Sequence, residues 1–314
     1  MADFYDFEDV FGSNPNLVYD EDMRGRIRHH RQSLENELFI DRLLKALGVR
    51  KASIAYPPES NRDLRELFQR IASSSSPDHH KHSVIYYLLK DLSQAKGDSH
   101  EQFSKASYLP DKYKTFIDGI WYLDRLKFER ALDYLTESSL TPTFPEEILY
   151  TLCRHSPRDD ATLPIAYYHT VSPSITSSKV LEAYFLVLCR TSATEAFYFS
   201  RAQGDVNHRV LFEKLIAFVH TKSTGPIKAT RGVELISLPL NEEEESWFSD
   251  YLEGKGSILP GAMDTLIMRG VVTGRSESKT QHRRRPSGQK IEGMNWDTLR
   301  NSTLAALPRL VPMK

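Results

Sequence analysis

Apolar residues recur at helical spacing along most of the chain, and short polar breaks divide them into segments. Between residues 113 and 135, one apolar set ends at Trp121 and a second begins at Phe128, with a polar break at Asp124. We predict two helices joined by a turn, with Asp124 as the cap between them. The small Ala131 is expected to face the first helix and let the two backbones approach. A single bent helix is the alternative, because Trp121 and Phe128 lie one heptad apart and would share a face.

The same pattern recurs downstream. Capping-box sequences at 143–146 (TFPE) and 192–195 (SATE) open two further predicted helices. A Ser-Pro step at 172–173 ends another, because the residue before proline disfavours the helical conformation. Helix starts fall about 16 residues apart, so pairs recur at the roughly 33 to 34 residues typical of helical-hairpin arrays. Residues 20–220 show no strand-like alternation, so we expect an all-α fold, an α-solenoid of stacked helical hairpins.

The flanking segments extend this plan. Residues 22–47 are expected to form one long amphipathic helix that ends at Gly48. Further helices are expected at residues 61–72, 81–92, 241–252 and 259–268. The pattern loosens at 221–232, where no helix is predicted. Four glutamates occupy positions 242–245. The positive field at a helix N-terminus stabilises such negative side chains, which explains them more simply than metal binding.

The two ends of the chain differ from its middle in composition. Residues 1–20 are acidic and aromatic with no obvious helix to join, which predicts a flexible arm that becomes ordered on a partner. The candidate partner-binding residues of this arm are Phe4, Tyr5, Phe7 and Phe11. Residues 21–269 form the predicted helical domain, and residues 270–314 are predicted to be a disordered basic tail that is polar and rich in Gly and Ser up to residue 295. A short docking helix at 296–310 is the alternative for its end.

One basic cluster in the tail suits a nucleic-acid or import-receptor contact. Arg283, Arg284 and Arg285 precede Pro286, which resembles the core of the AT-hook, a minor-groove reader. The AT-hook has glycine where Arg284 stands here, so attraction to phosphates is expected in place of base reading. A nuclear import signal explains the same three arginines, and both interpretations stay open.

Composition limits the remaining possibilities. The chain has 314 residues, 40% of them hydrophobic, which is enough for a packed core. Its formal net charge of -1 excludes a strongly basic chain. Cys153 and Cys189 lie in apolar surroundings, typical of buried reduced thiols in an intracellular protein. The acidic N-terminus has no signal-peptide pattern, and no apolar run is long enough for a membrane span.

Motifs that carry chemistry are absent from the sequence. It contains no G-x-S-x-G, no phosphate-binding glycine loop, no H-E-x-x-H and no C-x-x-C. The nearest metal candidate is His79, His80 and His82, which lack a second cluster at ligand spacing and lie in an expected loop. We assign no catalytic, cofactor-binding or metal-binding residue and expect no enzyme activity.

Seven segments follow one another in an informative order. They are LFIDRLLKALG, HHKHSVIYYLLKD, FIDGIWYLDRLKFERALDYLT, ILYTLC, IAYYHTVSPSITSSKVLEAYFLVLCRTSATEAFYFSR, LFEKLIAFV and ISLPLNEEEESWFSDYL. This succession, over residues 20–270, resembles the ELYS-like domain of nuclear pore assembly proteins in its small fungal form. The resemblance implies a helical scaffold nucleoporin in the nucleus, at the nuclear pore complex of the envelope, with a part in mRNA and protein transport.

The resemblance also implies partners. These are the nucleoporins of the Y-shaped outer-ring complex, especially the propeller-solenoid subunit of its long arm and that subunit's small propeller partner. A helical-repeat adaptor in another coat-like or chromatin-linked assembly is the alternative, because coat and pore solenoids rest on the same physics of stacked hairpins.

Overall fold

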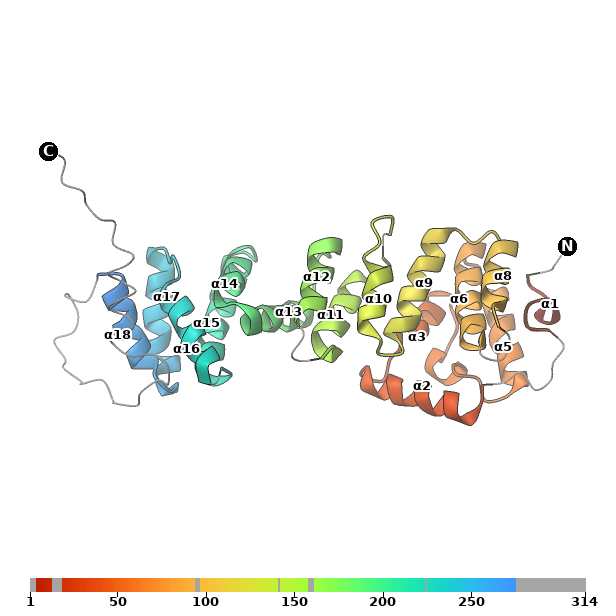
Figure 1. Ribbon diagram of the computed structural model, residues 1–314, viewed down its shortest axis with the longest axis horizontal. Helices are drawn as coiled ribbons and strands as arrows, with labels where there is room; N and C mark the ends of the chain where they lie inside the picture. The colour runs from red at the N-terminus through yellow and green to blue at the C-terminus, as the bar shows by residue number, and fades with distance from the viewer. Residues whose placement is uncertain are drawn as a thin grey trace. The chain divides into compact units, whose positions relative to one another are not determined.

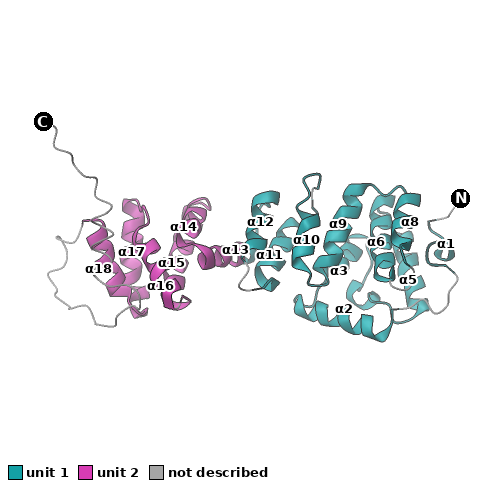
Figure 2. Ribbon diagram, in the orientation of Figure 1, with its two compact units in different colours: residues 1–180 teal, residues 181–314 magenta. Residues whose placement is uncertain are grey.

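Helices are the regular elements of this protein. The computed structural model describes residues 4–12, 19–93, 97–140, 142–157, 161–223 and 225–274, and within these ranges it contains no strand (Figure 1). The all-α prediction is confirmed. The chain forms two compact units, residues 1–180 and residues 181–314 (Figure 2). None of the described helices is long and apolar enough to cross a membrane.

The helices of the first unit follow the chain in order. They are α1 (Phe7–Phe11), α2 (Glu21–Ser33), α3 (Phe39–Ala46), α4 (Ala52–Ala55), α5 (Asn61–Ala72), α6 (Asp78–Asp91), α8 (Ser99–Ala106), α9 (Asp111–Leu123), α10 (Phe128–Leu135), α11 (Pro145–His155) and α12 (Thr162–Val171). Helix α13 (Ser178–Thr191) begins in the first unit and continues into the second. The second unit adds α14 (Ala193–Arg201), α15 (Asp205–Thr221), α16 (Gly225–Ile236), α17 (Glu242–Glu253), a short 3₁₀ helix (Lys255–Ile258) and α18 (Ala262–Val272).

The predicted helical hairpin is present as α9 and α10. Its turn contains Leu126 in the left-handed region, with φ of 58°, and Phe128 is buried at 7% exposure. The heptad spacing and apolar character of Trp121 also predict a core position, but Trp121 is only half-buried, so that prediction is wrong. Ala131 is fully buried as expected, but the tightest approach lies at Gly119, where an added Cβ would come within 2.6 Å of Leu135. The hairpin therefore depends on a glycine that the sequence pattern did not single out.

The long helix predicted over residues 22–47 is wrong. The chain breaks between α2 and α3, where Glu35 and Asn36 take positive φ angles of 57° and 67°. The break exposes the first N–H groups of α3, which then need acceptors. Asp124 supplies its carboxylate to two of these groups, and Asp41 accepts the N–H of Leu38 at 3.0 Å. The two helices are therefore separated by a cap that comes from elsewhere in the chain.

Helix α6 is buried along most of its length and contacts α3, α5, α8 and α9. It begins at Asp78, so His79, His80 and His82 lie in its first turns, whereas the sequence predicted a loop there. His82 is buried at 8% exposure and its ring packs edge-on against Phe103. The described residues contain no group of three metal-ligating side chains that could hold an ion.

The N-terminal arm is ordered in the structure from residue 4 to residue 12, and its expected flexibility is wrong there. Asp6 caps α1 by accepting the N–H groups of residues 8 and 9. Phe7 and Phe11 of α1 then pack against Phe68 of α5, with ring centroids 5.7 and 5.8 Å apart. The arm finds a helix of its own chain because its aromatic pair sits one helical turn apart and faces α5.

The capping predictions had mixed outcomes. Ser192 accepts the N–H of Glu195 at 3.3 Å, as predicted for the start of α14. The predicted box at 143–146 is wrong, because the Glu146 carboxylate instead accepts the N–H groups of Thr176 and Ser177, ahead of α13. At α17, Asn241 and Glu244 form a reciprocal capping box, which confirms that the glutamate run marks a helix N-terminus.

Two further features concern the second unit and the cysteines. Helix α16 occupies residues that the sequence left unassigned, and its buried Arg231 donates to the carbonyl of Cys189 at 2.6 Å. Cys153 and Cys189 are both buried, as predicted. Burial raises the pKa of Cys189 to about 12, so this thiol stays protonated at neutral pH.

Candidate interaction surface

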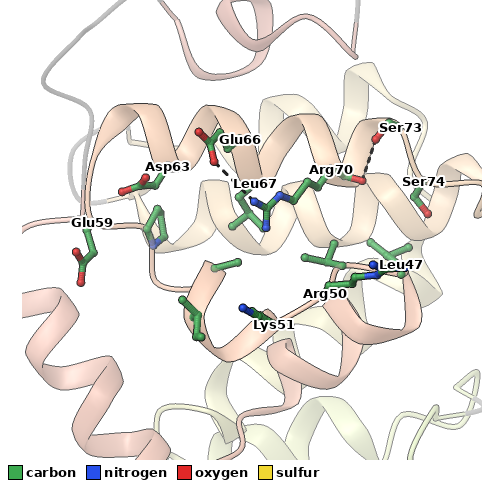
Figure 3. A pocket seen from close by; sticks show the side chains of 15 residues that line it. Leu47, Arg50, Lys51, Glu59, Asp63, Glu66, Leu67, Arg70, Ser73 and Ser74 are labelled. Carbon is green, nitrogen blue, oxygen red and sulfur yellow. Dashed lines mark hydrogen bonds and ion pairs between the residues drawn. The ribbon is translucent and has the colours of Figure 1, made fainter.

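A groove of about 840 Å³ lies beside α5 in the first unit (Figure 3). One wall is α5 itself, and the other comprises the turn after α3 and the short helix α4. The turn changes direction through Gly48 and Lys51, whose φ angles are 83° and 55°. Lys51 then begins α4, so the left-handed backbone places a basic side chain at the edge of the groove.

Basic side chains line one wall, and the α5 wall carries two carboxylates together with Arg70. Arg50 and Lys51 come from the turn, and Asp63 and Glu66 come from α5 (Figure 3). Glu66 is also within 3.7 Å of Arg70, one turn further along α5. Complementary walls of this kind can meet acidic and basic side chains of another protein at the same time.

An exposed apolar residue adds to this surface. Ile54 of α4 lines the groove and is 75% exposed, and Leu67 of α5 lies buried at its base. The lining contains no histidine, the side chain that most often serves as a general base and activates a serine nucleophile. The arrangement is suited to binding a protein segment.

A buried polar network supports the wall of the groove that α4 forms. The carbonyl of Tyr56, which follows α4, accepts Arg31 at 2.7 Å, and its hydroxyl donates to Asp91 at 2.6 Å. Asp91 also accepts the hydroxyl of Tyr19 at 2.9 Å and the indole N–H of Trp121 at 2.8 Å. Burial, together with the charge of Asp91, raises the pKa of Tyr19 and Tyr56 well above the ordinary value, so both hydroxyls remain donors. The network fixes α4 relative to α2, α6 and α9.

The four aromatic residues predicted to bind a partner have different surroundings. Phe7 and Phe11 are 8% and 0% exposed, so both side chains are occupied by the protein's own core. Phe4 is half-buried against His82 and Phe103. Tyr5 is 40% exposed, and its hydroxyl donates to the carboxylate of Asp78. Partner binding by these residues stays a prediction, with Tyr5 as the accessible member.

The other predicted site lies outside the described residues. Arg283, Arg284 and Arg285 fall in the segment 275–314, so their contact with DNA or an import receptor stays a prediction. The groove beside α5 was missed at the sequence level. A signal was present, since Asp63, Glu66 and Arg70 are spaced along one face of a helix, but charges at this spacing are common on solvated helices.

One cluster of the second unit has the geometry of a hydrolase triad. Ser200 Oγ lies 3.0 Å from His208 Nδ1, and His208 Nε2 lies 3.0 Å from Glu244 Oε1. Ser200 is 0% exposed and its hydroxyl donates to the carbonyl of Phe197 at 2.6 Å. A substrate cannot reach this oxygen, so the cluster joins α14, α15 and α17 and does not form an active site.

Comparison with known proteins places these features in a family. The family described as "ELYS: Nuclear pore complex assembly" matches residues 37–255. The uncharacterized protein ely5 of Schizosaccharomyces pombe is 31% identical over 232 residues, which cover 73% of each chain. Protein ELYS of Xenopus laevis is 22% identical over 240 residues, 70% of this chain but only 9% of the frog protein. The family match includes the groove beside α5 and, from the polar network, Tyr56, Asp91 and Trp121, whereas Tyr19 and Arg31 precede it.

Proposed function

The chain belongs to the ELYS family of nuclear pore complex assembly, and we propose that it is a structural nucleoporin that binds the Y-shaped outer-ring complex. It acts at the nuclear pore in the nuclear envelope, where it supports pore assembly and thereby mRNA and protein transport. The observation that carries the proposal is the family match over residues 37–255, because it spans helices of both units. The helical pairs are proposed to stack as an α-solenoid, a design that uses its surface for binding.

The proposed partners are the propeller-solenoid subunit of the long arm and its small propeller partner. The groove beside α5 is the proposed docking surface for one of them, since it combines Ile54 with walls of both charges. A central apolar contact surrounded by charges is the usual anatomy of a protein interface. Tyr5, on the exposed side of the N-terminal arm, is proposed as an additional contact.

Affinity purification of the tagged full chain from its own cells tests this function. We expect the outer-ring long-arm proteins to co-purify, and the double variant Lys51→Glu, Ile54→Asp to recover at least about tenfold less of them, as loss of an interface hot spot predicts. Both side chains are exposed, so the folded unit should tolerate the change. Tyr108→Asp is a matched control, because Tyr108 is 89% exposed in the same unit and lies outside the groove.

The outcomes separate the function from the docking surface. Absence of outer-ring proteins from the wild-type purification would contradict the proposed function, and recovery of another coat-like assembly would support the adaptor alternative. Equal recovery by the wild type and the groove variant would leave the function standing and remove the groove as its docking surface.

A further inference from the structure

A second recess of the first unit, of about 340 Å³, lies between α2 and the turn that joins α9 to α10. One face of α2 supplies Met23, Ile27 and His30, which are spaced by four and three residues. Arg26 and Lys127 are the exposed members of the lining, so they stand at its open edge. The recess is separate from the groove beside α5, with which it shares no lining residue.

The two carboxylates at the base of this recess are occupied by internal donors. Asp91 is 3% exposed, and its four donors come from Tyr19, Tyr56, Trp121 and Arg125. Asp124 is 2% exposed and accepts two backbone N–H groups of α3 and the hydroxyl of Tyr87. The charge of Arg125 offsets that of Asp91, and burial raises the pKa of Asp124 to about 7, which reduces its negative charge at neutral pH. The two cations at the edge are therefore the main uncompensated charges of the lining.

Those edge cations are uncommitted. Three arginines of α2 are held by ion pairs, Arg24 and Arg28 with Glu21 and Arg31 with Asp41. Within the part of the chain that the structure describes, Arg26 and Lys127 have no carboxylate within ion-pair distance. Two basic side chains from different elements therefore converge on one opening without a counter-charge.

The pKa of His30 responds to these positive charges. Burial lowers the pKa of this half-buried histidine, and the positive charges of Arg125, His29, Arg26 and Lys127 lower it further. The opening carries the basic side chains of Arg26 and Lys127 and adjoins Met23 and the half-buried indole of Trp121.

We propose that this recess binds an acidic side chain, an aspartate or glutamate within an acidic and apolar segment of a partner protein. Arg26 and Lys127 bind the carboxylate, since charge-assisted hydrogen bonds are the strong ones, and Met23 and Trp121 contact the neighbouring apolar group. The inference rests on the proposed function for the identity of the partner, and it assigns the chemistry of one contact.

A nucleic acid fits the same surface less well. Protein–DNA binding commonly uses a row of phosphate contacts along a stripe of free cations. The next arginines along α2, Arg24 and Arg28, are already paired with Glu21, and Glu59 lies 4.0 Å from Arg28. A phosphate backbone that extended beyond the recess would meet these carboxylates, so a short acidic peptide is the better match.

Hexaglutamate, with hexaglutamine as the uncharged control, tests the recess on the full-length protein at low ionic strength. Removal of both edge cations in the variant Arg26→Gln, Lys127→Gln should raise the Kd for hexaglutamate at least about tenfold. The matched control, Lys105→Gln, Lys112→Gln, removes two exposed lysines of the same unit that lie outside the recess. Its affinity should stay within about twofold of the wild type, since it keeps both edge cations.

A second readout separates binding in the recess from a general effect of charge. A carboxylate next to His30 favours the imidazolium, so hexaglutamate should raise the pKa of His30 in NMR titration, with His30→Gln used to assign its signal. The rise should be absent in the Arg26→Gln, Lys127→Gln variant and present in the lysine control. Equal Kd values for the two double variants, or an unmoved His30, would overturn the inference.

The same variants distinguish this inference from the proposed function. Tighter binding of a short DNA duplex than of hexaglutamate, lost in the Arg26→Gln, Lys127→Gln variant, would overturn the acidic-peptide assignment in favour of nucleic acid. Failure of the wild type to co-purify with outer-ring proteins, with hexaglutamate still bound in the recess, would remove the proposed function and leave the site. Full co-purification by the edge variant would overturn the recess as a partner contact and leave the function.

Discussion

The carboxylate of Asp124 accepts the backbone N–H of Phe39 at 2.7 Å, although the two residues are 85 positions apart. Its other oxygen accepts the N–H of Ile40 at 3.0 Å and the hydroxyl of Tyr87 at 2.9 Å. Asp124 is the residue at which α9 ends, and its side chain caps the start of α3 and contacts α6. This contact replaces the expected local cap and ties the end of α9 to α3 and α6. Tyr87 and Asp124 also line the proposed acidic-peptide recess.

Asp124→Asn should lower the free energy of unfolding by about 2 to 4 kcal/mol, because the amide has one acceptor oxygen where the carboxylate has two and turns a donor toward buried N–H groups. Chemical denaturation followed by circular dichroism measures the change. Asp133→Asn is the control, since Asp133 is exposed on α10, and a change within about 0.5 kcal/mol is expected. A similar small change for Asp124→Asn would show that the cap contributes little.

The pH dependence of stability should carry the signature of Asp124. Burial raises the pKa of this carboxyl from 3.8 to about 7, although hydrogen bonds from Phe39, Ile40 and Tyr87 lower it in part. The folded state therefore holds the proton more tightly than the unfolded state, and the free energy of unfolding falls as pH rises from about 4 to about 7. The stability gap between the wild type and Asp124→Asn should be larger at pH 5 than at pH 8, by on the order of 1 to 3 kcal/mol. A gap that shrinks on acidification would mean that the three donors outweigh burial.

The close approach of α9 and α10 predicts an inverted response to a helix-favouring substitution. Gly119→Ala should destabilise the protein by about 1 to 3 kcal/mol, because the new methyl group would overlap the Leu135 side chain. Gly25→Ala on α2 should stabilise it by about 0.5 to 1 kcal/mol, since no atom lies within 4 Å of the new methyl group. Thermal unfolding of the two variants tests both predictions. A higher Tm for Gly119→Ala would show that the Leu135 side chain moves aside at little cost.

Glu244 should matter far more than the neighbouring glutamates of α17. It is 2% exposed and accepts both Arg201, at 2.7 Å, and His208, at 3.0 Å. Glu244→Gln should cost about 2 to 4 kcal/mol, because it removes a buried charge that its partners need. Glu243→Gln changes an exposed residue of the same turn and should cost no more than about 0.5 kcal/mol. Chemical denaturation of both variants tests the difference. Equal losses in the free energy of unfolding would mean that each glutamate contributes only through its interaction with the helix dipole.

The Glu244 contribution should also weaken in acid. Burial raises the pKa of this carboxyl, but hydrogen bonds from Arg201, the backbone of Asn241 and His208 bring it below its ordinary value of 4.5. A lowered carboxyl pKa stabilises the folded state above 4.5, and this stabilisation is lost as pH falls through the folded pKa. The cost of Glu244→Gln should therefore shrink between pH 6 and pH 3, and a constant cost would contradict the lowered pKa.

The predicted role of the basic tail is tested by replacing Arg283, Arg284 and Arg285 with alanine. If the tail attracts phosphates, DNA binding should be weak, steeply dependent on salt and reduced in the triple variant. Filter binding at several salt concentrations measures this, and unaltered binding removes the DNA interpretation. Mislocalisation of the variant, with no DNA affinity in either protein, would support the import interpretation.

Helices with strong local signals were predictable from the sequence. The pairs of apolar sets on either side of Asp124 specified α9 and α10, because helical spacing and a polar break are properties of consecutive residues. The glutamate run before Trp247 specified the start of α17 for the same reason. The absence of catalytic motifs could also be read directly.

Tertiary structure decided the features that depend on distant partners. Asp124 is a reasonable local cap by sequence, and only the fold brings α3 within reach and so determines which N–H groups it binds. Residues 22–47 contain no proline that would end a helix, and the N–H groups exposed at the break between α2 and α3 are satisfied by this distant carboxylate. Phe7 and Phe11 show no sequence signal for α5, and their burial depends on the aromatic surface that the folded chain presents. Periodicity records which face of a helix is apolar, and it carries no information about which residues, far along the chain, will cover that face.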